Sequence, residues 1–285
     1  MTMGRPIWPP NPADLSLSMI SVVQEGLSES VSNNLYSGVL TFSAVLGNLD
    51  LKNSDLLADV RKYIKKIATK KHLERDPLLY KDLRKIYFST NWSDLTAIRN
   101  TVLCIVSWHS FLRYSDMSVI KVDDVTIERD HFVLYISKSK TDPGGEGQNV
   151  VVARNTGELD PWNLLQWYME VMGMGAMTSL ERSSAFLFPN ITSINDKGDI
   201  CVFDEQPIKY NTIQNIIKSL VEELGLDLGK AGTHCLRVGG ATGYTQRGVS
   251  AEVVMAKGRW RSEATRLRYT RVLLQDILET ADIFE

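Results

Sequence analysis

Apolar residues recur at helical spacing along most of the chain, and only one central stretch alternates with the period of a strand. Before residue 70 the pattern predicts three helices, at 16–27, 32–46 and 55–69. In the third of these, Val60, Ile64 and Ile67 share an apolar face, while lysines crowd the other sides. The Pro-rich residues 1–15 are expected to be irregular or extended. The first part of the chain is therefore expected to be a small helical module.

A charged segment that ends in proline, Lys70–Pro77, separates this module from the next periodic region. We place the domain boundary so that residues 1–73 form one domain and residues 74–285 the other. In the second domain the pattern predicts helices at 78–88, 92–110, 161–172, 212–224 and 272–283, an extended piece at 186–188 and an exposed loop at 193–206. Short strands are expected at 125–128, 131–137 and 148–153. The predicted fold class is mainly α with a small antiparallel β-sheet (α+β).

Composition limits the class of protein. The chain has 285 residues, of which 44% are hydrophobic, enough for one large core or two smaller ones. No apolar run approaches the length of a membrane span, and the N-terminus lacks the order of a signal peptide, so we expect an intracellular protein. Cys104, Cys201 and Cys235 are far apart and outside any metal-ligand spacing. Reduced thiols and no metal site are expected.

Charge is distributed unevenly along the chain, although the net charge is only −2. Ten Lys and Arg stand against three Asp and Glu between Arg61 and Lys85, and six stand against one from Lys257 to Arg271. Such stretches are typical of a surface that binds a phosphate backbone, but they also occur on ordinary solvated helix faces. The candidate DNA-binding cations are Lys62, Lys65, Lys66, Lys70, Lys71, Lys138, Arg259 and Arg261.

Residues 232–271 space several polar and aromatic side chains so that they can converge on one phosphate. A helix that starts after Thr233 places His234 and Arg237 on one face. Trp260 is expected in the turn after the following helix, and Tyr269 comes nine residues later. The residues expected to cap or end these two helices are Thr233, Gly248, Ser250 and Gly258.

Two further cations stand near the ends of predicted elements. Arg113 follows a strongly apolar helix, where a buried charge needs a partner or a ligand, and Asp116 is the nearest candidate partner. Lys140, with Lys138 two residues before it, lies in the loop between the second and third predicted strands. Each of these side chains, taken singly, has an ordinary structural explanation, such as an Arg113–Asp116 ion pair or a solvated loop lysine.

Taken together, the set resembles the catalytic residues of the tyrosine recombinases of the phage integrase family. The resemblance rests on four pieces, SFLRYSDMSVI, SKSKT, THCLRVGGAT and KGRW…RYTR, and extends from about Leu78 to Arg271. The matching residues are Arg113, Lys140, His234, Arg237, Trp260 and Tyr269. The sequence departs from the family in LRVGGAT, where many relatives have LRHTFAT, and in Asp116, where the family often has Glu. The N-terminal module fits the family's core-binding domain in position and character.

The resemblance implies a site-specific DNA recombinase that cleaves and rejoins strands through a 3′-phosphotyrosyl intermediate, without metal or ATP. Arginine suits such a site because its planar guanidinium meets two phosphate oxygens at once. Tyrosine is only weakly acidic, so as a nucleophile it needs cationic neighbours and a proton acceptor. The implied roles are nucleophile for Tyr269, acceptor for His234, phosphate clamp for Arg113 and Arg237, general acid for Lys140, oxygen-holding donor for Trp260 and orientation for Asp116.

The implied partner is double-stranded DNA, bound by a tetramer on two synapsed sites. Family members similarly hand a C-terminal element to a neighbouring protomer, and Val272–Glu285 is the candidate here, with docking on its own domain as the alternative. Two other functions stay open. A catalytically silent, domesticated DNA-binding protein would bind duplex without a covalent complex, and a type IB topoisomerase would relax supercoils without sequence preference.

Overall fold

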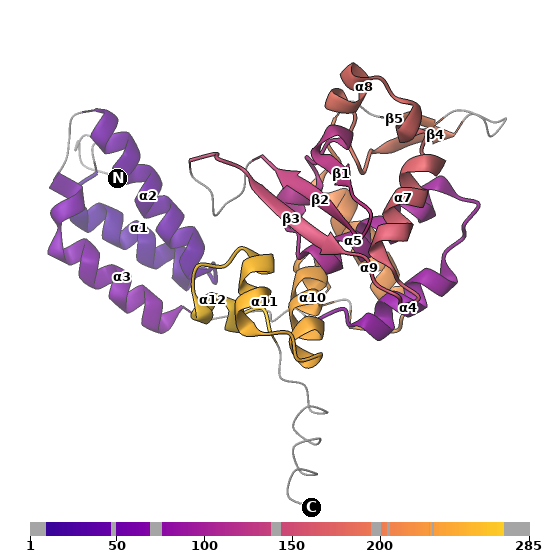
Figure 1. The fold of residues 1–285 in the computed structure, drawn as a ribbon. Helices are drawn as coiled ribbons and strands as arrows, with labels where there is room; N and C mark the ends of the chain where they lie inside the picture. The colour runs from indigo at the N-terminus through magenta and orange to yellow at the C-terminus, as the bar shows by residue number, and fades with distance from the viewer. Residues whose placement is uncertain are drawn as a thin grey trace, which may run out of the picture. The chain divides into compact units, whose positions relative to one another are not determined.

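The computed structural model describes residues 10–46, 50–68, 76–137, 144–194, 201–203, 206–227, 229 and 231–270. The chain divides into two compact units, Met1–Leu73 and Glu74–Glu285 (Figure 1). Several predicted features lie outside the described residues, namely Lys70, Lys71, Lys138, Lys140 and the segment 272–285. Among the helices that are described, none is both long and apolar enough to cross a bilayer.

The first unit contains the helices α1 (Pro12–Gln24), α2 (Glu29–Val45) and α3 (Asp55–Ile67), with a short 3-10 turn, η1 (Asp50–Asn53), before α3. α1 begins earlier than expected, because Asn11 caps it by accepting a hydrogen bond from the Asp14 amide at 2.8 Å. Pro12 then occupies the first turn, where its missing N–H costs nothing. The expectation of an irregular segment up to residue 15 was therefore wrong for its last residues.

The core of this unit is small and apolar. Its buried residues are Leu15, Met19, Leu51, Leu57, Ile64 and Ala68. Val60 packs against them, as its place beside Ile64 predicted, but Ile67 remains 39% exposed at the end of α3. The apolar face of α3 is thus shorter than the sequence pattern indicated.

The second unit is built around α5 (Leu95–Ser110), which Asp94 caps through the amide of Thr96. α5 packs against α4 (Tyr80–Ser89), α7 (Pro161–Val171) and α10 (His234–Gln246). Buried residues follow one another along α5 with almost no exposed face, as expected for a central core helix. The remaining helices are α6 (Tyr114–Met117), α8 (Ser179–Ser184), α9 (Tyr210–Glu223), α11 (Ala251–Gly258) and α12 (Glu263–Leu267), with 3-10 turns η2 (Val122–Asp124) and η3 (Met174–Ala176).

A three-stranded antiparallel sheet flanks these helices, in the order β1 (Val125–Ile127), β2 (His131–Ile136) and β3 (Gln148–Ala153) (Figure 1). Phe132 pairs with Val152 and Leu134 with Val150, and all four side chains face the core. The mainly helical fold with a small antiparallel sheet is therefore confirmed. The exposed loop expected at 193–206 is partly wrong, because β4 (Ile191–Ile194) and β5 (Cys201–Phe203) pair as a second antiparallel sheet. Strands this short give no readable alternation.

The glycines of α10 allow this helix to lie directly on α5. A Cβ atom at Gly239 would lie 1.8 Å from the Leu78 carbonyl oxygen, and one at Gly240 would lie 2.2 Å from the Trp108 carbonyl oxygen. The indole of Trp108 in turn donates a hydrogen bond to the Leu78 carbonyl at 2.8 Å. The unusual box LRVGGAT is thus explained by close packing: bulkier residues would not fit between α10 and α5.

Candidate catalytic site

Three turns and one helix start meet at the proposed site. The N-terminal end of α10 supplies His234 and Arg237, and the turn between α5 and α6 supplies Arg113. The turn after α11 supplies Trp260, and Tyr269 follows α12. The structure thus brings together five of the six predicted catalytic residues, while Lys140 lies outside the described residues.

Arg237 is the buried centre of this cluster. Its side chain is fully inaccessible to solvent, and its two terminal nitrogens donate hydrogen bonds to the carbonyl oxygens of Phe111 and Gly258. Burial, together with the neighbouring charges of Arg113 and Arg259, lowers the pKa of the guanidinium. An arginine nevertheless stays protonated at neutral pH, so the site holds a fixed positive charge.

Two aromatic rings cover this charge. The Arg237 guanidinium carbon lies 5.0 Å from the Trp260 ring centroid and 5.1 Å from that of Tyr269. The two rings are stacked at 4.9 Å with an interplanar angle of 19°. The His234 ring is also near Tyr269, at 6.2 Å between ring centroids. The tyrosine ring therefore has a cation, an indole and an imidazole as neighbours.

The caps that position these side chains differ in part from the predicted ones. Ser250 caps α11 through the Val253 amide, and Gly248 has a positive φ of 76°, as expected. Thr233 occupies the N-cap position of α10, as predicted, but it has helical backbone angles and makes no side-chain cap hydrogen bond. Gly258 is the last residue of α11, and the left-handed position belongs to Arg259 at φ 55°.

Gly258 ends α11, as expected, and it also makes room for the Trp260 ring. A Cβ atom at this position would lie 2.5 Å from the Trp260 ring. The glycine therefore allows the indole to fold back over α11, while its carbonyl oxygen accepts a hydrogen bond from Arg237. The close approach of the indole depends on the absence of a side chain at residue 258.

The buried carboxylate of Asp116 pairs with Arg259 rather than with the guanidinium of Arg113. One Asp116 oxygen accepts the Arg259 Nη2 hydrogen bond at 2.6 Å and the backbone amide of Arg113 at 3.1 Å. The Arg259 side chain is only 5% exposed. We expected Arg259 to be a DNA-binding surface cation, but the structure buries it beside the cluster. No pattern in the sequence signals this placement, because it depends on contact between α6 and the turn after α11.

Several buried nitrogen atoms at this site have no hydrogen-bond partner among the described residues. They are Nη1 of Arg113, Nε of Arg237, Nε and Nη1 of Arg259, and Nε1 of Trp260. Burial also lowers the pKa of the Arg113 guanidinium, which Asp116 partly offsets. Unmatched donors and positive charge in one place suit an anion with several oxygen atoms, such as a phosphodiester.

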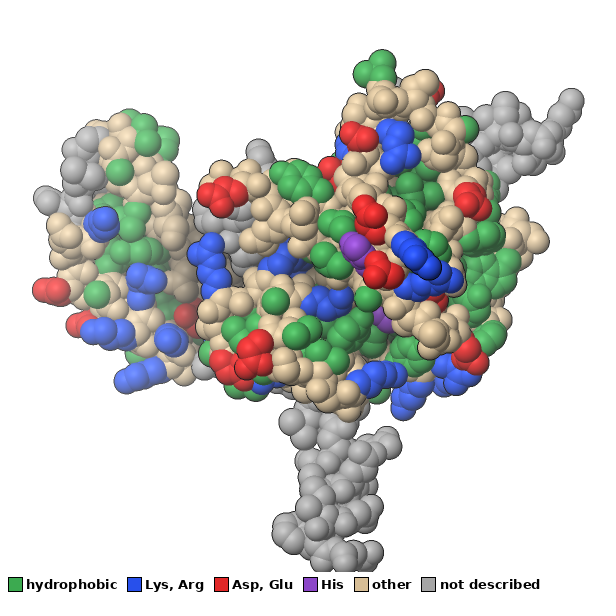
Figure 2. Space-filling view, in the orientation of Figure 1, with side chains coloured by type: hydrophobic (Ala, Val, Ile, Leu, Met, Phe, Trp, Pro, Cys, Tyr) green, Lys and Arg blue, Asp and Glu red, His purple; other side chains and the backbone are tan. Residues whose placement is uncertain are grey.

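The other predicted DNA-binding cations are on the surface where they are described. Lys62, Lys65 and Lys66 are exposed on α3, and Lys62 pairs with Asp59 at 3.0 Å. Figure 2 shows Lys and Arg side chains on the surface of the unit Met1–Leu73, which contains α3. Arg261 is exposed in the turn before α12. Exposed cations of this kind can contact a phosphate backbone.

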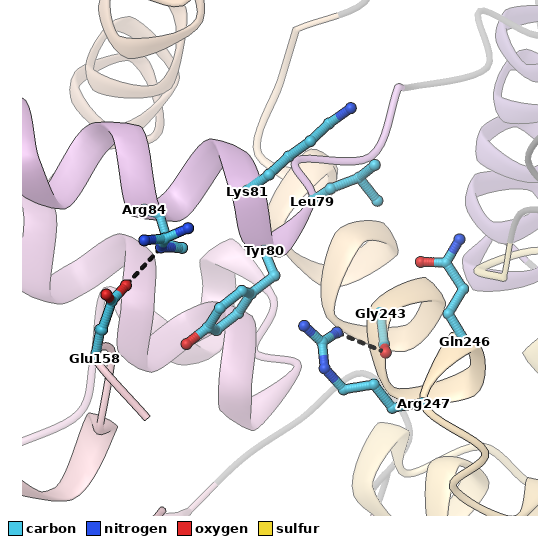
Figure 3. Close-up of a pocket in the computed structure, with 8 residues that line it drawn as sticks. All are labelled: Leu79, Tyr80, Lys81, Arg84, Glu158, Gly243, Gln246 and Arg247. Carbon is cyan, nitrogen blue, oxygen red and sulfur yellow. Dashed lines mark hydrogen bonds and ion pairs between the residues drawn. The ribbon is translucent and has the colours of Figure 1, made fainter. Parts of the chain in front are cut away.

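A separate pocket of about 600 Å³ lies between α4 and α10 (Figure 3). Arg84 pairs with Glu158 across it at 2.6 Å, and Arg247 lies over the ring of Tyr80 at 4.7 Å. The two arginines that line it are thus engaged with a carboxylate and an aromatic ring, and Lys81 also lines the pocket. None of the predicted catalytic residues lines this pocket, so it is distinct from the cluster at Tyr269.

Among the described residues, no group of three or more His, Cys, Asp or Glu side chains is arranged to hold a metal ion. Cys104 and Cys235 are buried thiols that form no disulfide, and burial raises the pKa of Cys104 to about 12. These two cysteines therefore belong to the core and contribute no nucleophile to the site.

Comparison with solved structures gives the same fold. XerH site-specific recombinase, bound to palindromic difH substrate in a post-cleavage complex, is similar with a TM-score of 0.59 and 17% identity over 96% of this chain and 70% of XerH. A lambda integrase dimer bound to a COC′ core site is similar with a TM-score of 0.59 and 14% identity over 94% of this chain and 82% of that one. The Tn1549 transposon integrase, in complex with circular intermediate DNA, has a TM-score of 0.57 and 12% identity over 97% of this chain and 86% of that one.

Sequence comparison identifies the family directly. No curated protein matches the chain. Residues 79–275, well over half of the chain, match the phage integrase family, over nearly the same range as the motifs in the sequence. The chain belongs to the phage integrase family of tyrosine recombinases.

Proposed function

We propose that this protein is a site-specific DNA recombinase in which Tyr269 is the nucleophile. The observation that carries this proposal is the position of the Tyr269 ring, stacked on Trp260 and facing the Arg237 guanidinium, beside buried donors that lack partners among the described residues. A phosphodiester placed there would receive hydrogen bonds on its non-bridging oxygens while the phenolic oxygen attacks phosphorus.

The first step forms a bond between the Tyr269 oxygen and phosphorus and breaks the bond from phosphorus to the 5′-oxygen of the next nucleotide. The phenolic proton passes to His234, whose ring lies beside that of Tyr269. The departing 5′-oxygen takes a proton from Lys140. Arg113 and Arg237 stabilise the charge that gathers on the phosphate in between.

The second step reverses the first with a different strand. A 5′-hydroxyl attacks the phosphotyrosyl bond, releases Tyr269 and restores a phosphodiester. Because one phosphoester bond replaces another at each step, the reaction needs no ATP. The fixed guanidinium charges supply the stabilisation of the transition state, so the proposal requires no metal.

Double-stranded DNA is the proposed substrate and partner. A tetramer on two synapsed sites, with the segment 272–285 exchanged between protomers, is the assembly that we propose for strand exchange. Unit Met1–Leu73, with exposed lysines on α3, would serve as the core-binding module, and unit Glu74–Glu285 as the catalytic domain.

The decisive test uses a pool of nicked duplexes with randomised sequence around the nick, so that cleavage traps the protein on the DNA. After denaturation, wild type should carry a covalently linked strand, and Tyr269→Phe should carry none. Tyr210→Phe, at a 44% exposed tyrosine on α9, is the matched control and should form the adduct normally. Absence of an adduct in wild type would overturn the proposal in favour of a silent DNA-binding protein.

Sequencing the trapped strands distinguishes a site-specific recombinase from a type IB topoisomerase. A recombinase should enrich a defined sequence around the trapped phosphate. A topoisomerase should instead trap many sequences and relax a supercoiled plasmid under the same conditions.

A further inference from the structure

Arg259 is a third guanidinium at the site, placed where the backbone favours glycine. It has φ 55°, and only Phe111, at φ 50°, shares a positive φ among the non-glycine residues that the structure describes. A side chain strains the backbone in this region, so the position calls for an explanation.

Arg237 donates hydrogen bonds to the backbone at or directly before these two positions. One of its terminal nitrogens donates to the carbonyl oxygen of Phe111, and the other to that of Gly258, the residue directly before Arg259. Arg259 therefore leaves the backbone next to the peptide group that Arg237 holds. The backbone at Arg259 is thus held in place by the hydrogen bond between Arg237 and Gly258.

The side chain of Arg259 turns inward to the carboxylate of Asp116. The Asp116 oxygen that accepts its Nη2 hydrogen bond at 2.6 Å also accepts the backbone amide of Arg113 at 3.1 Å. The same carboxylate thus binds the Arg259 guanidinium and the backbone amide of Arg113 at the start of α6. The side chains of Arg237 and Arg259 and the backbone of Arg113 are therefore linked through two carbonyl groups and one carboxylate.

Pairing with Asp116 uses only one edge of the guanidinium. Nε and Nη1 of Arg259 are buried and have no partner among the described residues. A buried ion pair with unsatisfied donors contributes little to stability, and apolar residues of similar volume would often do as well. Stability alone therefore explains neither the arginine nor its strained backbone.

We infer that Arg259 is a third phosphate-contacting guanidinium, and that Asp116 is the positioning residue that aims its free Nε and Nη1 atoms at a non-bridging oxygen. The inference rests on the proposed function and adds a catalytic residue to it. Three guanidinium charges and one carboxylate leave two net positive charges, which match the two negative charges of a pentacoordinate phosphorane.

The test compares two substrates in the trapping reaction, both with the target sequence recovered from wild type. One has an ordinary phosphodiester at the scissile position, and the other has a methylphosphonate, in which an uncharged methyl group replaces one non-bridging oxygen. Arg259→Gln removes the charge but keeps a polar side chain, and Arg259→Lys keeps the charge but loses the planar edge. Each diastereomer of the methylphosphonate is tested separately.

We expect Arg259→Gln to form the adduct about 100-fold more slowly than wild type on the phosphodiester, as for the loss of one oxyanion donor. On the methylphosphonate that lacks the contacted oxygen, the two proteins should differ only a few-fold, because wild type has lost the same interaction. Arg259→Lys should resemble Arg259→Gln more than wild type on the phosphodiester. The control is Arg182→Gln, which removes a partly buried guanidinium on α8 that lies near the carboxylate of Asp123. This variant should react at the wild-type rate.

Two results would overturn the inference while the proposed function stands. Equal rates for wild type and Arg259→Gln on the phosphodiester would show that Arg259 does not contact the reacting group. An equal loss on both substrates, with both diastereomers, would show that Arg259 acts only through the structure of the site. If wild type itself forms no adduct, the proposed function fails, and this inference fails with it.

Discussion

Arg237 faces the ring of Tyr269 from the protein interior, with its guanidinium carbon 5.1 Å from the ring centroid. Its terminal nitrogens donate hydrogen bonds to the carbonyl oxygens of Phe111 and Gly258, which belong to two different turns. The same side chain therefore places charge beside the proposed nucleophile and holds together the segments that carry Arg113 and Trp260. Loss of Arg237 should affect both the reaction and the stability of the fold.

Replacement of Arg237 by lysine keeps the positive charge but removes the planar guanidinium. Any effect on the reaction or on the stability of the fold is then not due to loss of charge alone. Arg237 reaches the two carbonyl oxygens with two separate terminal nitrogens, and lysine lacks this planar fork, so we expect at least one buried acceptor to be left unsatisfied. We expect Arg237→Lys to lower the free energy of unfolding by roughly 1–3 kcal/mol. The rate of adduct formation should fall by about 100- to 1,000-fold.

Urea unfolding and the trapping reaction measure these two quantities. Arg182→Lys serves as the control, because Arg182 also donates to two carbonyl oxygens, those of Met174 and Val122, but lies on α8 outside the site. It should lose stability without a comparable loss of rate. A wild-type rate in Arg237→Lys would remove Arg237 from the proposed phosphate clamp.

The second prediction concerns the contact between α10 and α5. A methyl group at Gly240 would lie 2.2 Å from the backbone oxygen of Trp108 and 2.8 Å from the ring of Phe111. Because backbone cannot move aside as a side chain can, Gly240→Ala should destabilise the protein by about 1–3 kcal/mol despite the better helix propensity of alanine.

The matched control for this substitution is Gly175→Ala in the same unit. Beyond its neighbours in the chain, Gly175 has no described heavy atom within 4 Å of the position that a methyl group would take, and its φ is not positive. Thermal unfolding of the two variants should therefore differ, with Gly175→Ala close to wild type. If Gly240→Ala unfolds at the wild-type temperature, the close packing of α10 on Trp108 is not required.

Periodicity is sufficient to predict the elements whose burial is regular. The central helix α5 and the strands β1 to β3 lie almost where the alternation of apolar residues placed them, because one face or the whole surface of each is buried. The start of α1 is harder to predict, since Pro12 lies among other prolines that favour irregular chain, and only the cap formed by Asn11 makes it a helix start. The pairing of β4 with β5 depends on contacts between separate short segments, which periodicity does not record.

The site is predictable in its residue types and order but not in its connections. His234, Arg237, Trp260 and Tyr269 follow from spacing along the last helices, and the structure brings them together with Arg113. The partner of Asp116 is not predictable, because Arg259 is more than a hundred residues away in the sequence. Closeness in sequence favours Arg113 as the ion-pair partner of Asp116, whereas the fold places the Arg259 guanidinium against this carboxylate.

A pH dependence of stability should come from His109, which is buried and hydrogen-bonded through Nδ1 to Tyr244 at 3.1 Å. Burial, together with the charges of Lys257 and Arg247, lowers the pKa of His109 to about 3. The unfolded chain binds a proton near pH 6.5, so the folded state loses stability as the pH falls below that value. At pH 5 this group should cost about 2 kcal/mol relative to pH 7.

His109→Gln tests this assignment, because an amide keeps a hydrogen-bonding group next to Tyr244 but does not titrate in this range. Urea unfolding at pH 7 and pH 5 should show a smaller difference for the variant than for wild type, by about 2 kcal/mol. Carboxylates contribute equally to both proteins and cancel in the comparison. Identical differences in the two proteins would exclude His109 as the source.

The last prediction decides which lysine of the hairpin loop protonates the leaving group, since Lys138 and Lys140 lie outside the described residues. A general acid is needed because a 5′-alkoxide is a poor leaving group, whereas a 5′-thiolate leaves without a proton. Lys140→Ala should therefore form the adduct at least about 100-fold more slowly on an ordinary duplex and regain most of the rate when sulfur replaces the bridging 5′-oxygen. Lys138→Ala should show a smaller loss that sulfur does not restore. The reverse pattern would assign the proton to Lys138, and Arg237→Lys, measured alongside, should remain slow on both substrates because its defect lies in charge stabilisation.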